Sequence, residues 1–138
     1  MKVHITENVE QAIENFNMIP VIYGKVDLTN VPDNSATDIY IENLDQIQHD
    51  FIEEFFTKLR SKVRKNGRIL ISGTELSILA RNVLSNNLSS QEFNNIILSG
   101  KRGLHKVNDI SNLLKKVGML IEEVSISGNS YAIKSSRS

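Results

Sequence analysis

The chain has 138 residues, of which 40% are hydrophobic and 23% are charged, and it contains no cysteine. This length is typical of one domain, and this composition argues against a disordered chain and excludes disulfides and thiolate metal sites. Sixteen Lys and Arg residues balance sixteen Asp and Glu residues, so no excess positive charge attracts nucleic acid or an anionic membrane. The first residues do not resemble a signal peptide, and no run of about eighteen apolar residues occurs. We expect one cytoplasmic domain over residues 1–138, without a nucleic-acid or membrane partner.

The first 26 residues predict a strand, a helix and a second strand. Residues 3–5 are short and apolar, as in a strand, and residues 7–16 repeat apolar side chains every three or four positions, as in a helix with one buried stripe. The apolar positions of this helix are Val9, Ala12, Ile13 and Phe16. Residues 19–26 are rich in β-branched and aromatic side chains, which favours a strand whose Pro20 lies near its start or at a sheet edge.

The middle of the chain predicts a loop, a strand, a long helix and a buried strand. Residues 30–35 concentrate turn formers, and residues 37–41 then form a strand. Residues 47–63 show a regular helical stripe, which we expect Gly67 to close as a left-handed cap. The stripe consists of Ile47, Phe51, Ile52, Phe55, Phe56, Leu59 and Val63. Residues 68–73 predict a parallel strand buried on both faces.

The last third predicts three helices and a terminal hairpin. A helix is expected within residues 75–84, and Ser89 followed by Glu92 has the spacing of a capping box that starts another. After a break at residues 100–103, a third helix begins at Asn108 and ends at Gly118. Two strands, 120–126 and 130–134, are separated by Gly128 and Asn129, which suit a tight turn.

Strands that alternate with helices predict an α/β fold with a mainly parallel sheet and helices on both faces. The terminal hairpin requires one antiparallel strand within that sheet. No internal repeat or linker is visible, so the whole chain is expected to form a single unit.

Three stretches resemble the class I S-adenosylmethionine-dependent methyltransferases. Residues 26–40 are similar to that family's D-x-x-x-L-P-[FY]-x-D-N-S-F-D-x-I/V stretch, with Val31 in place of Leu and Thr37 in place of Phe. Residues 59–72 resemble its L-x-P-G-G-x-x-x-I helix, turn and strand, with Asn66 where a glycine often stands. Residues 103–121 resemble its late helix ending in A-G-F-x-I, and the customary hairpin follows. The pieces occur in the family's order, so the resemblance implies a Rossmann-like methyltransferase fold.

The family's glycine-rich cofactor loop, [DE]-x-G-x-G-x-G, is missing. No G-x-G occurs in the chain, although such glycines let the backbone approach the cofactor. In the comparison with the family, residues 1–5 resemble the second strand, so the first strand, the loop and the first helix are absent. The resemblance therefore implies a truncated domain that binds no cofactor by itself. If the domain is active, the resemblance implies S-adenosylmethionine as its cofactor.

The resemblance points to four candidate site residues. Asp27 occupies the place of an acid or amide that approaches the adenine amino group, although an aspartate that opens a turn explains it as well. Glu7 is the nearest candidate for the acid that holds the ribose hydroxyls. Glu42 and Asn43 follow a strand at the carboxyl edge, where open α/β sheets bind ligands, so they are candidate substrate contacts or solvated strand-end residues. Asp38 matches a position that usually supports the fold.

Other polar residues carry weaker signals. His4, His49 and His105 are far apart in the sequence and lack a metal-ligand spacing such as H-x-x-x-H, so we assign no metal. Lys101 and Arg102 lie between two glycines, which predicts either a small anion-binding loop or a solvated basic turn.

Two functions stay open at this point. The first is a degenerate, non-catalytic domain with a binding or assembly role, which the missing loop favours. The second is an S-adenosylmethionine-dependent methyltransferase for a small molecule or glycan precursor, which either binds its cofactor in an unusual way or is completed by a partner chain. A different strand order would favour a third, an unrelated α/β enzyme or regulatory domain.

The loss of a central strand also bears on assembly. Residues 1–5 and 37–41 either pair directly or leave a gap that a second chain must cover, because unpaired buried backbone groups cost about 1–3 kcal/mol each. We expect a homodimer or a hetero-complex, with residues 1–25 and the adjoining helices in the contact.

Overall fold

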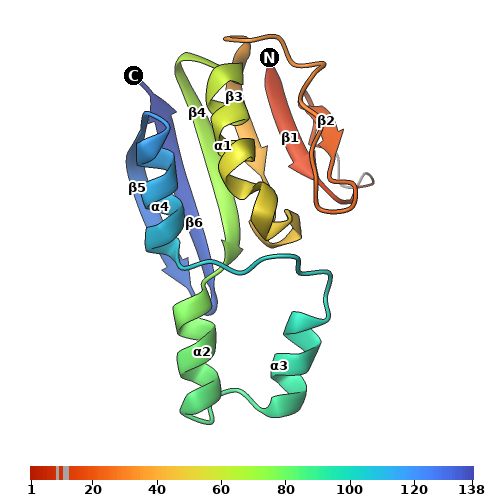
Figure 1. The fold of residues 1–138 in the computed structure, drawn as a ribbon, viewed down its shortest axis with the longest axis vertical. Coiled ribbons are helices and arrows are strands. Elements are labelled where there is room, and N and C mark those ends of the chain that lie inside the picture. Colours follow the sequence, from red (N-terminus) through yellow and green to blue (C-terminus); the bar gives the residue numbers. More distant parts are fainter. Residues whose placement is uncertain (9, 11–12) are drawn as a thin grey trace.

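A computed structural model describes residues 1–8, 10 and 13–138, and in it six strands form one continuous sheet (Figure 1). The strands are β1 (Lys2–Thr6), β2 (Asn17–Pro20), β3 (Ala36–Ile41), β4 (Val63–Thr74), β5 (Met119–Ser127) and β6 (Ser130–Arg137). Their spatial order is β2-β1-β3-β4-β6-β5, and β6 runs antiparallel to both of its neighbours while the other pairs are parallel. The predicted α/β fold with a C-terminal antiparallel hairpin is confirmed.

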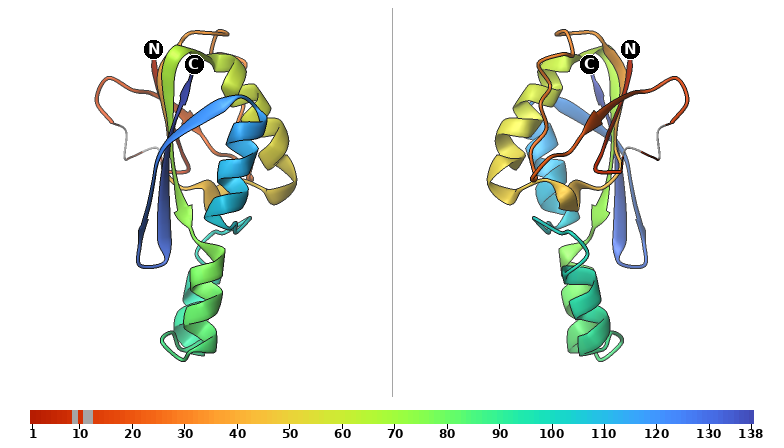
Figure 2. Two further views of the ribbon diagram at one scale, coloured as in Figure 1. Left: turned by 90° about the vertical axis from the view of Figure 1, so that its left-hand side faces the viewer. Right: turned by 90° about the vertical axis from the view of Figure 1, so that its right-hand side faces the viewer.

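Four α-helices accompany the sheet within the described residues. They are α1 (Ile52–Lys62), α2 (Leu76–Leu84), α3 (Ser90–Ile97) and α4 (Val107–Lys116), and two short 3-10 turns, η2 (Leu44–Gln46) and η3 (His49–Phe51), precede α1. Helices α1 and α4 lie on the same face of the sheet, whereas α2 and α3 project beyond its end (Figure 2). No helix in the described part of the chain is long and apolar enough to cross a membrane.

The opposite face carries none of these four helices (Figure 2). The helix expected over residues 7–16 includes residues 9, 11 and 12, which lie outside the described residues. Its last part is a turn, since Asn15 has a positive φ of 69° and the Phe16 N–H donates to the Ile13 carbonyl at 3.1 Å. Within the described residues, helices therefore cover one face of the sheet.

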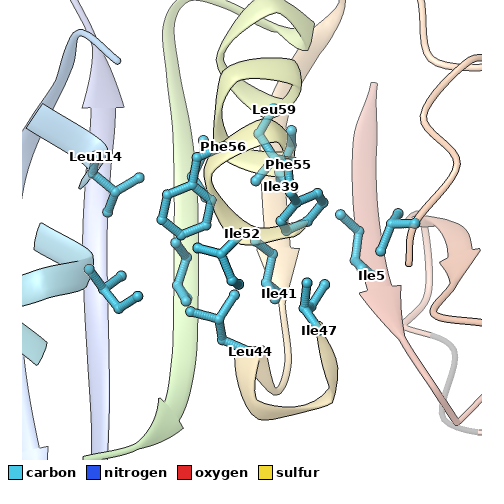
Figure 3. Close-up of a cluster of buried hydrophobic side chains, with 14 of the residues drawn as sticks. Ile5, Ile39, Ile41, Leu44, Ile47, Ile52, Phe55, Phe56, Leu59 and Leu114 are labelled. Atoms are coloured by element: carbon cyan, nitrogen blue, oxygen red, sulfur yellow. The ribbon is translucent and has the colours of Figure 1, made fainter. Parts of the chain in front are cut away.

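The core lies between this face of the sheet and α1 and α4 (Figure 3). Side chains alternate along each strand, so Ile39 and Ile41 of β3 are buried against the helices while Tyr40 between them points to the other face. The largest fully buried side chains from α1 are Phe55, Phe56 and Leu59. Each such side chain contributes about 1.5–3 kcal/mol when it leaves water, so this layer stabilises the arrangement of β1, β3 and β4.

Strands β1 and β3 pair directly with each other. Their register runs from Lys2 opposite Asp38 to Ile5 opposite Ile41. Beyond the pair, the Thr37 N–H donates to the Met1 carbonyl at 2.8 Å, and the Glu42 N–H donates to the Ile5 carbonyl at 3.3 Å. Of the two alternatives for the missing strand, direct pairing or a gap, the structure has direct pairing of β1 with β3. A gap between β1 and β3 therefore gives no reason for a second chain at residues 1–25.

The strand predicted over residues 19–26 was wrong beyond Pro20. Strand β2 ends there, and Ile22 and Lys25 exchange two backbone hydrogen bonds, of 2.9 and 3.0 Å, across a two-residue turn. Tyr23 and Gly24 in this turn have positive φ values of 51° and 76°, which reverse the chain. Pro20 lies on the edge strand β2, where its missing N–H removes no hydrogen bond from the interior of the sheet.

The long helix predicted over residues 47–63 is shorter than expected, and Gly67 is not its cap. Helix α1 ends at Lys62, and Val63 already has extended dihedral angles and begins β4. The positive φ falls on Asn66 instead, at 66°. A Cβ atom at Gly67 would lie 2.8 Å from the Ala36 carbonyl oxygen, so glycine is needed there for the close approach of β3 to β4.

The last third folds as predicted. Ser89 and Glu92 form the capping box of α3, with Ser89 Oγ accepting from the Glu92 N–H at 3.1 Å. Gly118 follows α4 with a φ of 95°, and the turn at Gly128 joins β5 to β6. Capping residues and turn residues were sufficient to predict these helices and the hairpin, because the elements are short and close in sequence.

Candidate functional site

The carboxyl ends of β1, β3 and β4 surround a polar hollow of about 500 Å³. Parallel strands end at the same edge of a sheet, so residues that are distant in sequence meet there. The polar residues that line the hollow are Asn8, Glu42, Asn43, Gln46, Ser72, Thr74, Lys101 and Ser130. Two of the predicted substrate contacts, Glu42 and Asn43, therefore lie together at this edge.

Glu42 is held by the end of β1. The Thr6 hydroxyl donates to Glu42 Oε2 at 2.5 Å, and the Asn8 N–H donates to Thr6 Oγ1 at 3.0 Å. His4 Nε2 lies 3.9 Å from the same carboxylate oxygen, and the His4 ring stacks on Tyr40 with centroids 5.2 Å apart. Since Thr6 and His4 are buried, the Glu42 carboxylate has a fixed position between two strands.

Asp45 is a buried carboxylate beneath the hollow, only 1% exposed. Its carboxylate accepts the Thr74 N–H at 3.0 and 3.2 Å and the Lys101 ammonium at 2.9 Å. The Asn43 side chain positions it by accepting the Asp45 N–H at 3.1 Å, which caps η2. Sequence reasoning missed Asp45, because no spacing in the sequence relates an acid in a 3-10 turn to a lysine 56 residues later.

Lys101 fits neither the anion-binding loop nor the solvated turn that the sequence suggested. Its side chain is 11% exposed, and Asp45 neutralises it. The backbone just after Lys101 is held by the same residue, since the Arg102 N–H donates to the Asp45 carbonyl at 2.7 Å. The loop 100–103 is thus held to the end of β4 by one buried ion pair.

Tyr131 of β6 lies against this ion pair. Burial raises the pKa of its phenol far above the ordinary range, and the negative charges of Asp45 and Glu75 add to the effect. Its hydroxyl has no hydrogen-bond partner among the residues that the structure describes. This environment therefore favours the neutral phenol. A Cβ atom at Gly73 would lie 2.7 Å from Tyr131 Oη, so the ring fills the space that this glycine leaves.

Glu75 and His105 serve the fold beside the hollow. Glu75 is buried and caps two helices, accepting the Ile78 N–H at 2.8 Å and the Val107 N–H at 2.9 Å. His105 stacks on His49 with ring centroids 5.2 Å apart. Burial lowers the pKa of His105, and the charge of His49 lowers it further. Among the described residues, no group of three or more histidines and carboxylates has an arrangement that holds a metal ion.

Asp27 and Glu7 lie outside this hollow. Asp27 is exposed, and its Oδ1 accepts the Thr29 N–H at 3.0 Å and the Thr29 hydroxyl at 2.7 Å, bonds that lower its pKa. It lines a separate hollow of about 980 Å³ beside β2 and α1. Glu7 is exposed just after β1. The four candidate residues are therefore not brought together in one site.

Several solved structures with a similar arrangement of elements are S-adenosylmethionine-dependent methyltransferases. The enzyme from Mesorhizobium loti aligns with 98% of this chain over 79% of its own length, at 9% identity and a TM-score of 0.65. The fold is that of S-adenosylmethionine-dependent methyltransferases. The enzyme from Archaeoglobus fulgidus gives 98% and 75% coverage, 12% identity and a TM-score of 0.66. A putative methyltransferase from Listeria monocytogenes aligns with 99% of this chain over 79% of its own length, at 8% identity and a TM-score of 0.64.

At these identities the likeness concerns the methyltransferase fold alone. The chain spans about three-quarters of the length of these three structures, as a truncated methyltransferase-like domain would. No family model and no curated protein matches the sequence.

The residues at the carboxyl edge do not fit a cofactor held in the glycine-loop manner of this fold. A glycine turn after a strand offers free backbone N–H groups and space for the ligand. Here β1 runs into Thr6, Glu7 and Asn8, and the Asn8 N–H is already used by Thr6. Gly73, the glycine that lines the hollow, faces the Tyr131 ring. The hollow can hydrogen-bond a small polar group through Glu42 and its neighbours.

Proposed function

We propose that this chain is a degenerate methyltransferase-like domain with a binding or assembly role and without methyl-transfer activity. The direct pairing of β1 with β3, closed at the carboxyl edge by the bond between Thr6 and Glu42, carries this proposal. The two strands meet where the family's first strand and glycine loop would stand. No room is left there for a cofactor cradle of the usual kind.

The side chains at the edge support the same conclusion. The carboxylate of Asp45 is occupied by Lys101 and the Thr74 N–H, and Glu42 is held by Thr6. Burial favours the protonated phenol of Tyr131. In these contacts Asp45 and Glu42 serve the fold, and we assign neither of them the role of a general base. We also propose a cytoplasmic location, because a chain without cysteine needs no oxidising compartment.

A second candidate is an S-adenosylmethionine-dependent methyltransferase for a small molecule or glycan precursor, completed by a partner chain. The polar hollow favours it, since Glu42 and Asn43 lie at the edge where open α/β sheets bind ligands. In that case the partner supplies the missing cofactor contacts, and Glu42 contacts the acceptor.

Thermal unfolding of the whole chain, with and without S-adenosylmethionine or its demethylated product, tests the proposal. A ligand present at about 100 times its dissociation constant stabilises the folded state by about 2.7 kcal/mol, which raises the melting temperature by several degrees. We expect no rise with either compound. A rise that Glu42→Gln removes would instead support the second candidate, and a rise that this variant leaves unchanged would place the cofactor elsewhere.

A further inference from the structure

Helices α2 and α3 form a hairpin that projects beyond the end of the sheet (Figures 1 and 2). Helix α3 has no buried residue, and α2 buries only Leu79. Helices this short are marginal in water unless their apolar faces pack against something. The apolar side chains of this hairpin therefore have little to pack on within their own chain.

An apolar groove of about 430 Å³ lies between the two helices. It is lined by Leu79, Val83 and Leu84 from α2 and by Phe93 and Ile97 from α3. Leu84 is 85% exposed at the end of α2, and Leu98, just after α3, is 80% exposed. The hairpin thus offers a hollow between its helices together with projecting leucines of a size that fills such a hollow.

The charges of the hairpin are few and opposite. Residues 76–99 contain two charged side chains, Arg81 on α2 and Glu92 on α3, although 23% of the whole chain is charged. Charged residues are depleted in the cores of protein interfaces, and an isologous contact repeats every pair about a two-fold axis. One positive and one negative side chain on the two helices suit pairing with the same surface in a second copy.

We propose that a second copy of this chain docks on the α2–α3 hairpin and forms a two-fold bundle of four short helices. Leu98 of each copy enters the groove of the other, whose wall includes the exposed Leu84, and Arg81 faces Glu92 of the partner subunit. The hairpin has no net charge, so two copies approach without repulsion, and it has no basic cluster to attract an anionic membrane or nucleic acid. The contact differs from the one expected beside residues 1–25, and it holds whether or not the domain binds a cofactor.

Sedimentation equilibrium of the full chain tests the proposal. We expect a monomer–dimer equilibrium in which Leu84→Glu or Leu98→Glu weakens association at least about tenfold, or about 1.4 kcal/mol. The matched control is Tyr23→Glu, since Tyr23 is 83% exposed on the turn at residues 22–25, outside the hairpin, and the same charge is added there. A chain that stays monomeric at high micromolar concentration would overturn the proposal. So would a dimer that all three variants weaken equally, or assembly into species larger than a dimer.

Disulfide trapping provides a second readout, because the chain has no cysteine of its own. Under mild oxidation, Leu84→Cys is expected to give a covalent dimer faster than Tyr23→Cys at the same concentration. Equal rates for the two variants would mean random collision and would contradict docking on the hairpin. Circular dichroism of each variant shows whether the fold is retained, so that loss of the dimer is not confused with loss of the structure.

Discussion

The Thr6 hydroxyl donates a 2.5 Å hydrogen bond to Glu42 and so joins the ends of two neighbouring strands. In the methyltransferase family a further strand is expected between these two. Thr6 ends β1 and Glu42 follows β3. Because the two strands pair directly, the hydroxyl and the carboxylate meet at the carboxyl edge of the sheet. The bond therefore stabilises the sheet and also fixes the position of a residue that lines the hollow.

Removal of this hydroxyl should destabilise the fold. Thr6→Val keeps the shape of the side chain but leaves the Glu42 carboxylate without its donor, which costs about 1–3 kcal/mol. Thr57→Val is the control, since the Thr57 hydroxyl is exposed on α1 and donates to the Glu53 carbonyl at 3.1 Å. Urea unfolding measures both variants. Equal stabilities for Thr6→Val and Thr57→Val would show that the bond does not stabilise the junction of β1 and β3.

The buried pair of Asp45 and Lys101 should be costly to break. Asp45→Asn leaves the Lys101 ammonium buried without its counter-charge, and loss of one partner of such a pair costs about 3–5 kcal/mol. The exposed pair of Glu54 and Lys58, 3.0 Å apart, is the comparison, and Glu54→Gln should cost less than about 1 kcal/mol. Unfolding at low and high salt measures both. A loss for Asp45→Asn that salt abolishes would mean that the pair is solvated.

Gly73 and Tyr131 should be coupled. Gly73→Ala places a methyl group 2.7 Å from Tyr131 Oη, and such overpacking costs about 1–3 kcal/mol. Tyr131→Phe removes a hydroxyl that has no partner among the described residues, so it should be neutral or stabilising. It should relieve part of the strain in the alanine variant, since Cζ stays 2.9 Å from the added methyl group. A double-mutant cycle on the free energy of unfolding measures this coupling. Strictly additive effects would contradict the contact.

His105 should make the fold sensitive to acid. Burial lowers the pKa of His105 below its ordinary value of 6.5, so the unfolded chain binds a proton more readily than the folded chain. The free energy of unfolding therefore falls as the pH falls from about 7 to about 5. His105→Gln should show a shallower fall, although the charges of Asp45 and Asp109 reduce the effect by acting in the opposite direction.

Proton NMR of the His105 ring measures this directly. We expect a midpoint below 6.5, which rises when His49→Gln removes the neighbouring charge. A midpoint at or above 6.5 in the unmodified chain would contradict the burial argument.

The parts of the fold that sequence predicts well are those fixed by neighbouring residues. The start of α3 is marked by the capping box of Ser89 and Glu92, and the end of α4 by Gly118. Both helices could therefore be predicted from a few neighbouring residues. The strand predicted through Val26 failed because β-branched residues suit any buried extended chain. Positive φ at Tyr23 and Gly24 turns that chain back toward the core instead.

The candidate site was harder to predict because it depends on contacts between distant segments. Glu42 and Asn43 were found because strand ends in open sheets bind ligands, and both line the hollow. Asp45 and Lys101 were missed as a pair because only the tertiary fold brings them together. Asp27 followed from the resemblance to the family, and its place beside β2 depends on the early end of that strand.

Calorimetric titration of the full chain with S-adenosylmethionine, and then with its demethylated product, tests the central claim most directly. We expect no saturable heat with either compound, because the bond between Thr6 and Glu42 joins the ends of β1 and β3 and leaves no glycine loop between them. Saturable binding with a micromolar dissociation constant, about −8 kcal/mol, would contradict it.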